Sequence, residues 1–317
     1  MTSLAKFVSL IVVLVVVNIG LSLCGNRRYV YSNEEIELTK QVVIDPKHCN
    51  TGHDLIIVIS SGTSGNFNEY RQQLRSGWIG TAKSHNIGVW FALAVSDNKT
   101  VNEKIKKESD TYHDIIQFNI IDDYYNLTLR GIAIQRWVQK YCQSVKYFLK
   151  ADDLVFVDVD HLLKVLPNFK TGINGITVDD RTVNRQPTYR WHVPIEYYSL
   201  DKYPEYHYGS AIIVDNVTRN QLLTKLDEYR VIPGNNVLDV KDVSLWGIIA
   251  NWAGIPRHNS SHFAYDDCLC IPRLHTVPIH YDCRQRTDTW RDFLDKSKNT
   301  NAYCNHKNVS SVGGYWI

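Results

Sequence analysis

Apolar runs alternate with helix-like segments through the first half of the chain. Four apolar runs, rich in β-branched side chains, predict strands of a parallel sheet at residues 55–60, 88–95, 113–119 and 151–157, the last interrupted by paired acids. Helices are predicted at residues 66–78, with Arg71 and Arg75 on one face, and at residues 129–142. This order predicts an α/β fold: a Rossmann-type, mixed but mainly parallel sheet with flanking helices, which binds ligands at the carboxyl ends of its strands.

A longer apolar segment precedes this region. Residues 7–24 carry no charge, and at about 1.5 Å per residue they form a helix of about 27 Å, close to the hydrocarbon thickness of a bilayer. Lys6 precedes the segment and Arg27 follows it, so the charges leave its orientation ambiguous. A cleaved signal peptide is the alternative, and both interpretations send the remaining chain across the membrane. We expect a cytosolic tail (1–6), a transmembrane signal-anchor (7–24), a stem (25–53) and one lumenal domain (54–317).

Composition changes this picture little. The hydrophobic fraction of 44% is sufficient for a large core, and a net charge of +2 gives no reason to expect nucleic acid as a partner. Five glycosylation sequons agree with a lumenal location; their asparagines are Asn98, Asn126, Asn216, Asn259 and Asn308.

The cysteines also indicate an oxidising compartment. Of the 7 cysteines, Cys24 lies in the apolar segment, and the others are Cys49, Cys142, Cys268, Cys270, Cys283 and Cys304. The six cysteines outside the apolar segment are an even number, which is typical of disulfides, and the sequence leaves their pairing open. A zinc site is the alternative, although the spacing fits no standard zinc pattern.

Acidic residues at the end of the fourth strand are candidates for chemistry. Asp152 and Asp153 are costly there unless they face a cation or a polar ligand, as they would in a nucleotide-sugar site where a divalent metal neutralises the diphosphate. Asp158 and Asp160 alternate, which predicts that they share one face of a strand. The alternative is that these acids cap the strand and the next helix.

Two further segments admit two interpretations each. Asp242 precedes a helix-like apolar run at residues 248–255, as either an N-cap or a functional acid. The aromatic loop at residues 203–210 is either a wall for stacking sugars or a packed turn.

Several short motifs occur in a fixed order over residues 55–255. They are Arg71-Gln-Gln-Leu-Arg75-Ser-Gly-Trp78, an acid-rich stretch at residues 114–130, Trp137 with Cys142, Lys150-Ala-Asp-Asp-Leu154, Arg190-Trp-His192, Tyr203-Pro-Glu-Tyr-His-Tyr-Gly209, and Lys241-Asp-Val243 with Gly247. In this order they resemble the family 31 glycosyltransferases, the β-1,3-galactosyltransferase and N-acetylglucosaminyltransferase group.

The resemblance implies a GT-A-like fold behind a single membrane helix, in a type II protein of the Golgi membrane. It implies UDP-galactose or UDP-N-acetylglucosamine as donor, a glycan on protein or lipid as acceptor, and formation of a β-1,3 bond with inversion. Asp242 is then the general base. Mn²⁺ is expected near Asp152 and Asp153, with His280 or His275 completing its ligands.

The same resemblance suggests binding roles for other residues. Arg71 and Arg75 are candidates for phosphate or uridine contacts, with structural ion pairs as the alternative. Four residues are expected to flank donor or acceptor sugar: Trp191, Tyr203, Tyr206 and Gly209.

This sequence departs from the family pattern at two positions that matter for activity. Leu154 replaces the third acid of the Asp-Asp-Asp motif, and Leu cannot ligate a cation. Lys241 replaces the acid before Asp242, which reverses a charge beside the expected base. A catalytically weak or inactive member of the family, binding nucleotide or glycan without turnover, is therefore the alternative function.

Overall fold

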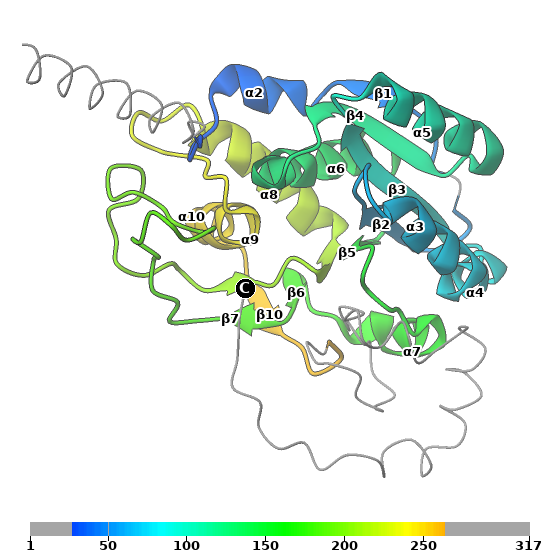
Figure 1. Ribbon diagram of the computed structural model, residues 1–317. Coiled ribbons are helices and arrows are strands. Elements are labelled where there is room, and N and C mark those ends of the chain that lie inside the picture. The colour runs from blue at the N-terminus through cyan, green and yellow to red at the C-terminus, as the bar shows by residue number, and fades with distance from the viewer. Residues whose placement is uncertain (1–26, 50, 264–317) are drawn as a thin grey trace, which may run out of the picture.

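The computed structural model describes residues 27–49 and 51–263 of the 317-residue chain (Figure 1). Within them, one eight-stranded sheet has the order β1-β4-β3-β2-β5-β9-β6-β10. Its strands are β1 (Val42–Ile44), β2 (Leu55–Ser60), β3 (Gly88–Val95), β4 (Ile115–Ile121), β5 (Tyr147–Asp152), β6 (Ile173–Gly175), β9 (Ala211–Asp215) and β10 (Arg257–Asn259). Two short strands, β7 (Thr177–Val178) and β8 (Tyr206–His207), pair with each other.

The four central strands are parallel. β2 pairs in parallel with both β3 and β5, and β3 pairs in parallel with β4. β9 is antiparallel to β5 and β6, and β1 is antiparallel to β4. The prediction of a mixed, mainly parallel sheet with flanking helices is therefore confirmed.

Helices cover both faces of the sheet. They are α2 (Asn33–Leu38), α3 (Phe67–Ser76), α4 (Trp78–Ser84), α5 (Lys99–Tyr112), α6 (Leu127–Tyr141), α7 (Val159–Val165), α8 (Asn216–Tyr229), α9 (Lys241–Val243), the π-helix η3 (Ser244–Ile249) and α10 (Ala250–Trp252), with short 3-10 turns η1 (Tyr124–Asn126) and η2 (Leu166–Asn168). Side chains of α6, α8 and η3 share one core with Ile56 and Val58 of β2. Side chains of α3, α4, α5 and α7 share the other with Ile57 and Ile59, because successive side chains of a strand face opposite ways.

Two predicted strands keep their bounds, and one predicted helix is divided. Strands at residues 55–60 and 88–95 are confirmed as β2 and β3. The helix expected at residues 66–78 is instead two helices, because Gly77 leaves helical geometry (φ −103°, ψ −129°) and separates α3 from α4.

Regular structure begins before the predicted strand at residues 55–60. Residues 25–53, expected to be a stem, contain α2 and β1, and β1 joins the sheet edge by pairing Val42 with Phe118. Ser32 and Glu35 form a capping box that starts α2, a local signal present in the sequence.

The strand predicted at residues 151–157 is also wrong in its bounds. β5 starts at Tyr147 and ends at Asp152, so Asp158 and Asp160 do not share a strand face. The side chain of Asp158 instead caps α7 by accepting a hydrogen bond of 2.9 Å from the His161 amide. Asp160 is exposed and pairs with His85 at 3.0 Å. The capping alternative is therefore correct for Asp158.

One disulfide ties the N-terminal part to the core. Cys49 is bonded to Cys142 at the end of α6, which confirms the disulfide prediction for this pair. The other five cysteines lie outside the described residues. Across residues 27–49 and 51–263 no helix is long and apolar enough to span a bilayer, and the apolar segment 7–24 lies outside that part of the chain.

Candidate active site

The carboxyl end of β5 carries the first charged group of the site. Lys150 and Asp152 are two residues apart on this strand, so both side chains project from the same face. The Lys150 ammonium, only 2% exposed as a residue, donates to Oδ1 of Asp152 and to the carbonyl of Gly209. Burial lowers the pKa of Lys150 to about 8, although the charge of Asp152 opposes this shift.

A second lysine reaches the same carboxylate from the opposite side. Nζ of Lys241, in the first turn of α9, lies 3.3 Å from Oδ2 of Asp152 and 3.7 Å from Oδ1 of Asp242. Burial opposes charge on Lys241, but Asp152 and Asp242 outweigh it and raise the lysine pKa above its usual value. Burial opposes charge on Asp152 too, and the two lysines outweigh it and lower its pKa.

The carboxylate of Asp242 packs directly against Gly209. Its Oδ1 is buried and makes no hydrogen bond. The N-cap position of α9 is Val240, which makes no side-chain cap bond, so Asp242 does not cap this helix. A Cβ at Gly209 would overlap Oδ1 of Asp242 and lie 2.7 Å from its Cγ. Only glycine at position 209 therefore provides room for this carboxylate.

The helix that follows Asp242 continues as a π-helix packed on β8. A Cβ at Gly247 would lie 2.8 Å from the Cβ of Tyr206, so the absent side chain permits this close approach. Ser244 fixes the entry to the helix, since its Oγ accepts a hydrogen bond of 3.1 Å from the Leu238 amide. π-helical turns are rare and frequently occur at functional sites.

Asp153 directly follows the last residue of β5. It is buried, its Oδ2 makes no hydrogen bond, and burial raises its pKa. Arg130 of α6 holds the loop beside it, donating to the Ser61 carbonyl at 2.8 Å and to Oδ1 of Asp122 at 3.2 Å.

The described side chains do not make a set that fits Mn²⁺. Both oxygens of Asp152 already contact lysines, and Leu154 offers hydrocarbon where a third carboxylate would be needed. Within residues 27–49 and 51–263 no three His, Cys, Asp or Glu side chains are grouped as metal ligands. His275 and His280 lie outside the described residues.

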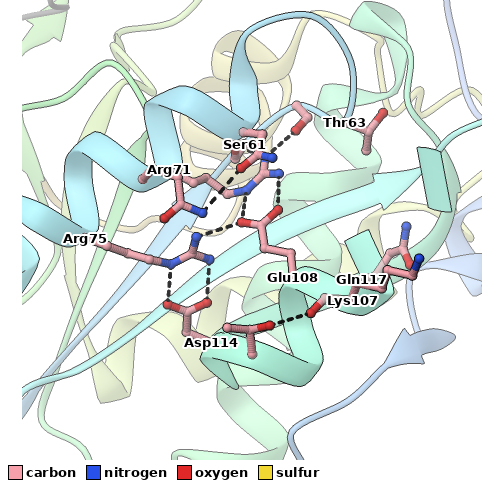
Figure 2. Close-up of polar contacts among 12 residues, drawn as sticks. Ser61, Thr63, Arg71, Arg75, Lys107, Glu108, Asp114 and Gln117 are labelled. Carbon is pink, nitrogen blue, oxygen red and sulfur yellow. Dashed lines mark hydrogen bonds and ion pairs between the residues drawn. The ribbon is translucent and has the colours of Figure 1, made fainter. Parts of the chain in front are cut away.

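Arg71 and Arg75 form a buried network with two acids (Figure 2). Arg71, 1% exposed, binds Glu108 through two hydrogen bonds of 2.8 and 2.6 Å and also donates to the carbonyl of Gly62 at 2.9 Å. Arg75 binds Asp114 through two hydrogen bonds of 2.9 and 2.7 Å and Glu108 through a third of 2.8 Å. These contacts correspond to the ion-pair alternative, and they link α3, α5 and the start of β4.

The predicted sugar-contacting residues differ in their exposure and in what they contact. Tyr203 and Tyr206 are 8% and 7% exposed, so they are packed side chains of the loop at residues 203–210 rather than an open wall. Gly209 is adjacent to Asp242, as described above. Trp191 is half-buried, and its Nε1 donates to the hydroxyl of Tyr124 at 2.6 Å.

The sequence placed Lys241 beside Asp242 but did not indicate that Lys150, Lys241 and Arg130 gather around the acids at the end of β5. The alternation Lys150-Ala-Asp152 was a usable signal, because it places ammonium and carboxylate on one strand face. The approach of Lys241 to Asp152 had no local signal, since 89 residues separate them in sequence.

Comparisons with known proteins identify the family of this chain. Residues 69–261 match the family model described as galactosyltransferase. The chain is 28% identical over 270 residues to human and mouse beta-1,3-galactosyltransferase 1, covering 80% of this chain and 78% of those proteins. It is 27% identical over 202 residues to human N-acetyllactosaminide beta-1,3-N-acetylglucosaminyltransferase 4, covering 62% of this chain and 53% of that protein.

Two solved structures are also similar. One is a Drosophila galactosyltransferase 7 mutant in complex with manganese, UDP-Gal and xylobiose (13% identity, 80% of this chain and 82% of that chain, TM-score 0.33). The other is mouse xyloside xylosyltransferase 1 in its apo form (10% identity, 67% of this chain and 88% of that chain, TM-score 0.31).

An α/β sheet with paired acids at the carboxyl end of a central strand, together with the family match, defines the class of this protein as a glycosyltransferase. The chain belongs to the galactosyltransferase family, which confirms the resemblance to family 31 drawn from its motifs.

Proposed function

We propose that this protein transfers galactose or N-acetylglucosamine from a UDP-sugar to the 3-hydroxyl of a glycan on a glycoprotein or glycolipid, with inversion at the anomeric carbon. The relatives named above, which are β-1,3 transferases of these two sugars, support the choice of donor and linkage. We place the reaction in the Golgi lumen, with residues 7–24 as the anchor of a type II membrane protein.

The observation that carries the proposal is the carboxylate of Asp242. Its side chain is 28% exposed, and its Oδ1 makes no hydrogen bond but has the Lys241 ammonium 3.7 Å away. In our proposal this partly exposed carboxylate accepts the proton of the acceptor hydroxyl. The hydroxyl oxygen then forms a bond to the anomeric carbon on the side opposite the diphosphate.

The leaving group departs as this bond forms. The bond between the anomeric carbon and the diphosphate oxygen breaks, and its electron pair stays on UDP. Cations stabilise such a developing negative charge. Because the described side chains do not fit Mn²⁺, we assign no step to a metal.

Asp242→Asn tests the assignment, with Asp160→Asn as a matched control at an exposed site. The purified full-length protein is incubated with UDP-galactose or UDP-N-acetylglucosamine and a panel of glycan acceptors, and UDP release is measured. We expect Asp242→Asn to lower turnover by about 10²- to 10⁴-fold, the usual contribution of a general base, and Asp160→Asn to leave it unchanged.

Two outcomes would count against the proposal. Turnover of Asp242→Asn near that of the parent would show that another group is the base. UDP binding by the parent without turnover of either donor would favour the alternative function, a family member that binds nucleotide without catalysis, which Leu154 and Lys241 motivate.

A further inference from the structure

Lys241 lies between the carboxylate at the end of β5 and the proposed base. Its Nζ is 3.3 Å from Oδ2 of Asp152 and 3.7 Å from Oδ1 of Asp242. A cation next to Asp152 would have to share this space with the lysine ammonium. Like charges at such distances repel strongly where burial limits screening by water.

The ionisable side chains that interact with Lys241 and with Asp152 balance in charge. They come from β5 and the turn after it, from α6 and from α9: Lys150, Arg130 and Lys241 are basic, and Asp152, Asp153 and Asp242 are acidic. Arg130 also pairs with Asp122 at 3.2 Å, so three cations share these carboxylates and neutralise most of the negative charge that would attract a divalent cation.

The two lysines differ in what they can offer a ligand. An ammonium has three N–H donors. Lys150 is buried and already donates to Asp152 and to the carbonyl of Gly209. Lys241 has a single hydrogen bond, to Asp152, and its side chain stays 14% exposed, so it retains donors for a ligand oxygen.

The position of Lys241 suits an anionic ligand. The carboxyl ends of the central parallel strands are where open α/β sheets bind ligands, and Asp152 is the last residue of β5. Lys241 and the partly exposed side chain of Asp242 are neighbours there, so one ligand could contact both a cation and a base.

We propose that the ammonium of Lys241 takes the place of a divalent cation at the diphosphate of the donor, so that UDP binding and UDP release need no metal. This inference rests on the proposed function, because it concerns the same donor site. When the glycosidic carbon–oxygen bond of the donor breaks, its electron pair stays on the diphosphate oxygen, and Lys241 donates a charge-assisted hydrogen bond to that anion. The acceptor proton goes to Asp242.

Binding of UDP and of uridine by the full-length protein, measured by calorimetry in EDTA and in Mn²⁺, tests this without depending on turnover. Uridine lacks the diphosphate, so it reports whether a variant keeps a folded nucleoside site. We expect the parent to bind UDP with the same affinity in EDTA and in Mn²⁺. Lys241→Met should weaken UDP binding by about tenfold to a hundredfold without changing uridine binding.

Two variants control for changes other than loss of the charge. Lys241→Arg keeps a cation and should retain most of the UDP affinity. Lys225→Met removes an exposed lysine on α8, paired with Glu228, and should behave as the parent. The same Lys241→Met protein should lose UDP release in EDTA and not recover it in Mn²⁺.

The remaining outcomes distinguish failure of the inference from failure of the proposed function. UDP binding by the parent that needs Mn²⁺ would overturn it while leaving the transferase proposal standing. Lys241→Met binding UDP as tightly as the parent would also overturn it. Metal-independent UDP binding without transfer to any acceptor would support the inference and contradict the proposed function alone. Absence of UDP binding under both conditions would contradict both.

Discussion

Because Gly209 has no side chain, the carboxylate of Asp242 can occupy the space beside it. The two residues are 33 positions apart, but a Cβ at residue 209 would overlap Oδ1 of Asp242 and lie 3.1 Å from Cε of Lys241. Gly209 is not among the glycines with positive φ, so its requirement is steric rather than conformational.

We therefore expect Gly209→Ala to displace the proposed base. A displacement of about 1 Å can cost about 10²-fold in rate, so UDP release should fall by at least that factor. Gly80→Ala, within α4, is a matched control, since its Cβ would lie 3.9 Å from the nearest atom, the carbonyl oxygen of Arg75. It should retain full turnover and raise the free energy of unfolding by about 0.5–1 kcal/mol. Full activity of Gly209→Ala would contradict the steric argument.

The network around Glu108 makes a prediction about stability. Arg75→Met leaves Glu108 and Asp114 buried with fewer partners, which should lower the free energy of unfolding by about 3–5 kcal/mol. Lys106→Met, in an exposed pair with Asp110 on the same helix, should change it by less than about 1 kcal/mol. Urea unfolding measures both.

UDP affinity separates the two roles considered for Arg75. If the arginine is structural, Arg75→Met binds UDP normally under conditions where it remains folded. Unchanged stability with a large loss of UDP affinity would instead support a donor contact.

Buried His207 predicts a dependence of stability on pH. Burial lowers its pKa from 6.5 to about 4, so between those values the unfolded chain binds more protons than the folded chain. The contribution of neutral His207 to stability is complete above pH 6.5 and is lost as pH falls through this window, by about 2 kcal/mol at pH 5.

His207→Gln should remove that part of the pH dependence. The difference in unfolding free energy between parent and variant should shrink by about 2 kcal/mol from pH 7.5 to pH 5, as measured by urea unfolding. His48→Gln, at an exposed position, should follow the parent at both pH values. Parallel profiles for parent and His207→Gln would show that His207 protonates as easily in the folded chain as in the unfolded chain.

Among the described sequons the structure distinguishes two kinds of asparagine. Asn98 and Asn259 are exposed. Asn126 and Asn216 are half-buried, and their amide nitrogens donate to the carbonyls of Ile121 at 3.0 Å and Gln143 at 2.8 Å. We expect glycans at Asn98 and Asn259, and unmodified Asn126 and Asn216, because a glycan at either would compete with these contacts.

Peptide mass spectrometry of protein from a secretory host, with deglycosylation in ¹⁸O water, measures the occupancy of each site. Thr100→Ala and Ser261→Ala remove the two exposed sequons and should abolish the glycan at the matching asparagine only. High occupancy at Asn216 would show that the contact with Gln143 does not resist modification.

The sequence determined the parallel core and the family. The runs at residues 55–60 and 88–95 are apolar throughout because those strands are covered on both faces, so their identity and bounds were readable without any partner. The order of the motifs along the chain was sufficient to identify the family, because that order can be read without knowing how far apart the residues lie in space. Short elements whose pairing supplies their stability, such as β1 on β4, carry no such signal.

Only the tertiary structure decided how charge is arranged at the site. The sequence placed two acids at the end of a strand and suggested a metal; folding brings Lys150 and Lys241 onto the oxygens of Asp152. Folding likewise places Arg71 and Arg75 in ion pairs with Glu108. The physical reason is that electrostatic energy depends on distance and burial, and contacts between residues far apart in sequence are created by the packing of α9 and α3 against the sheet.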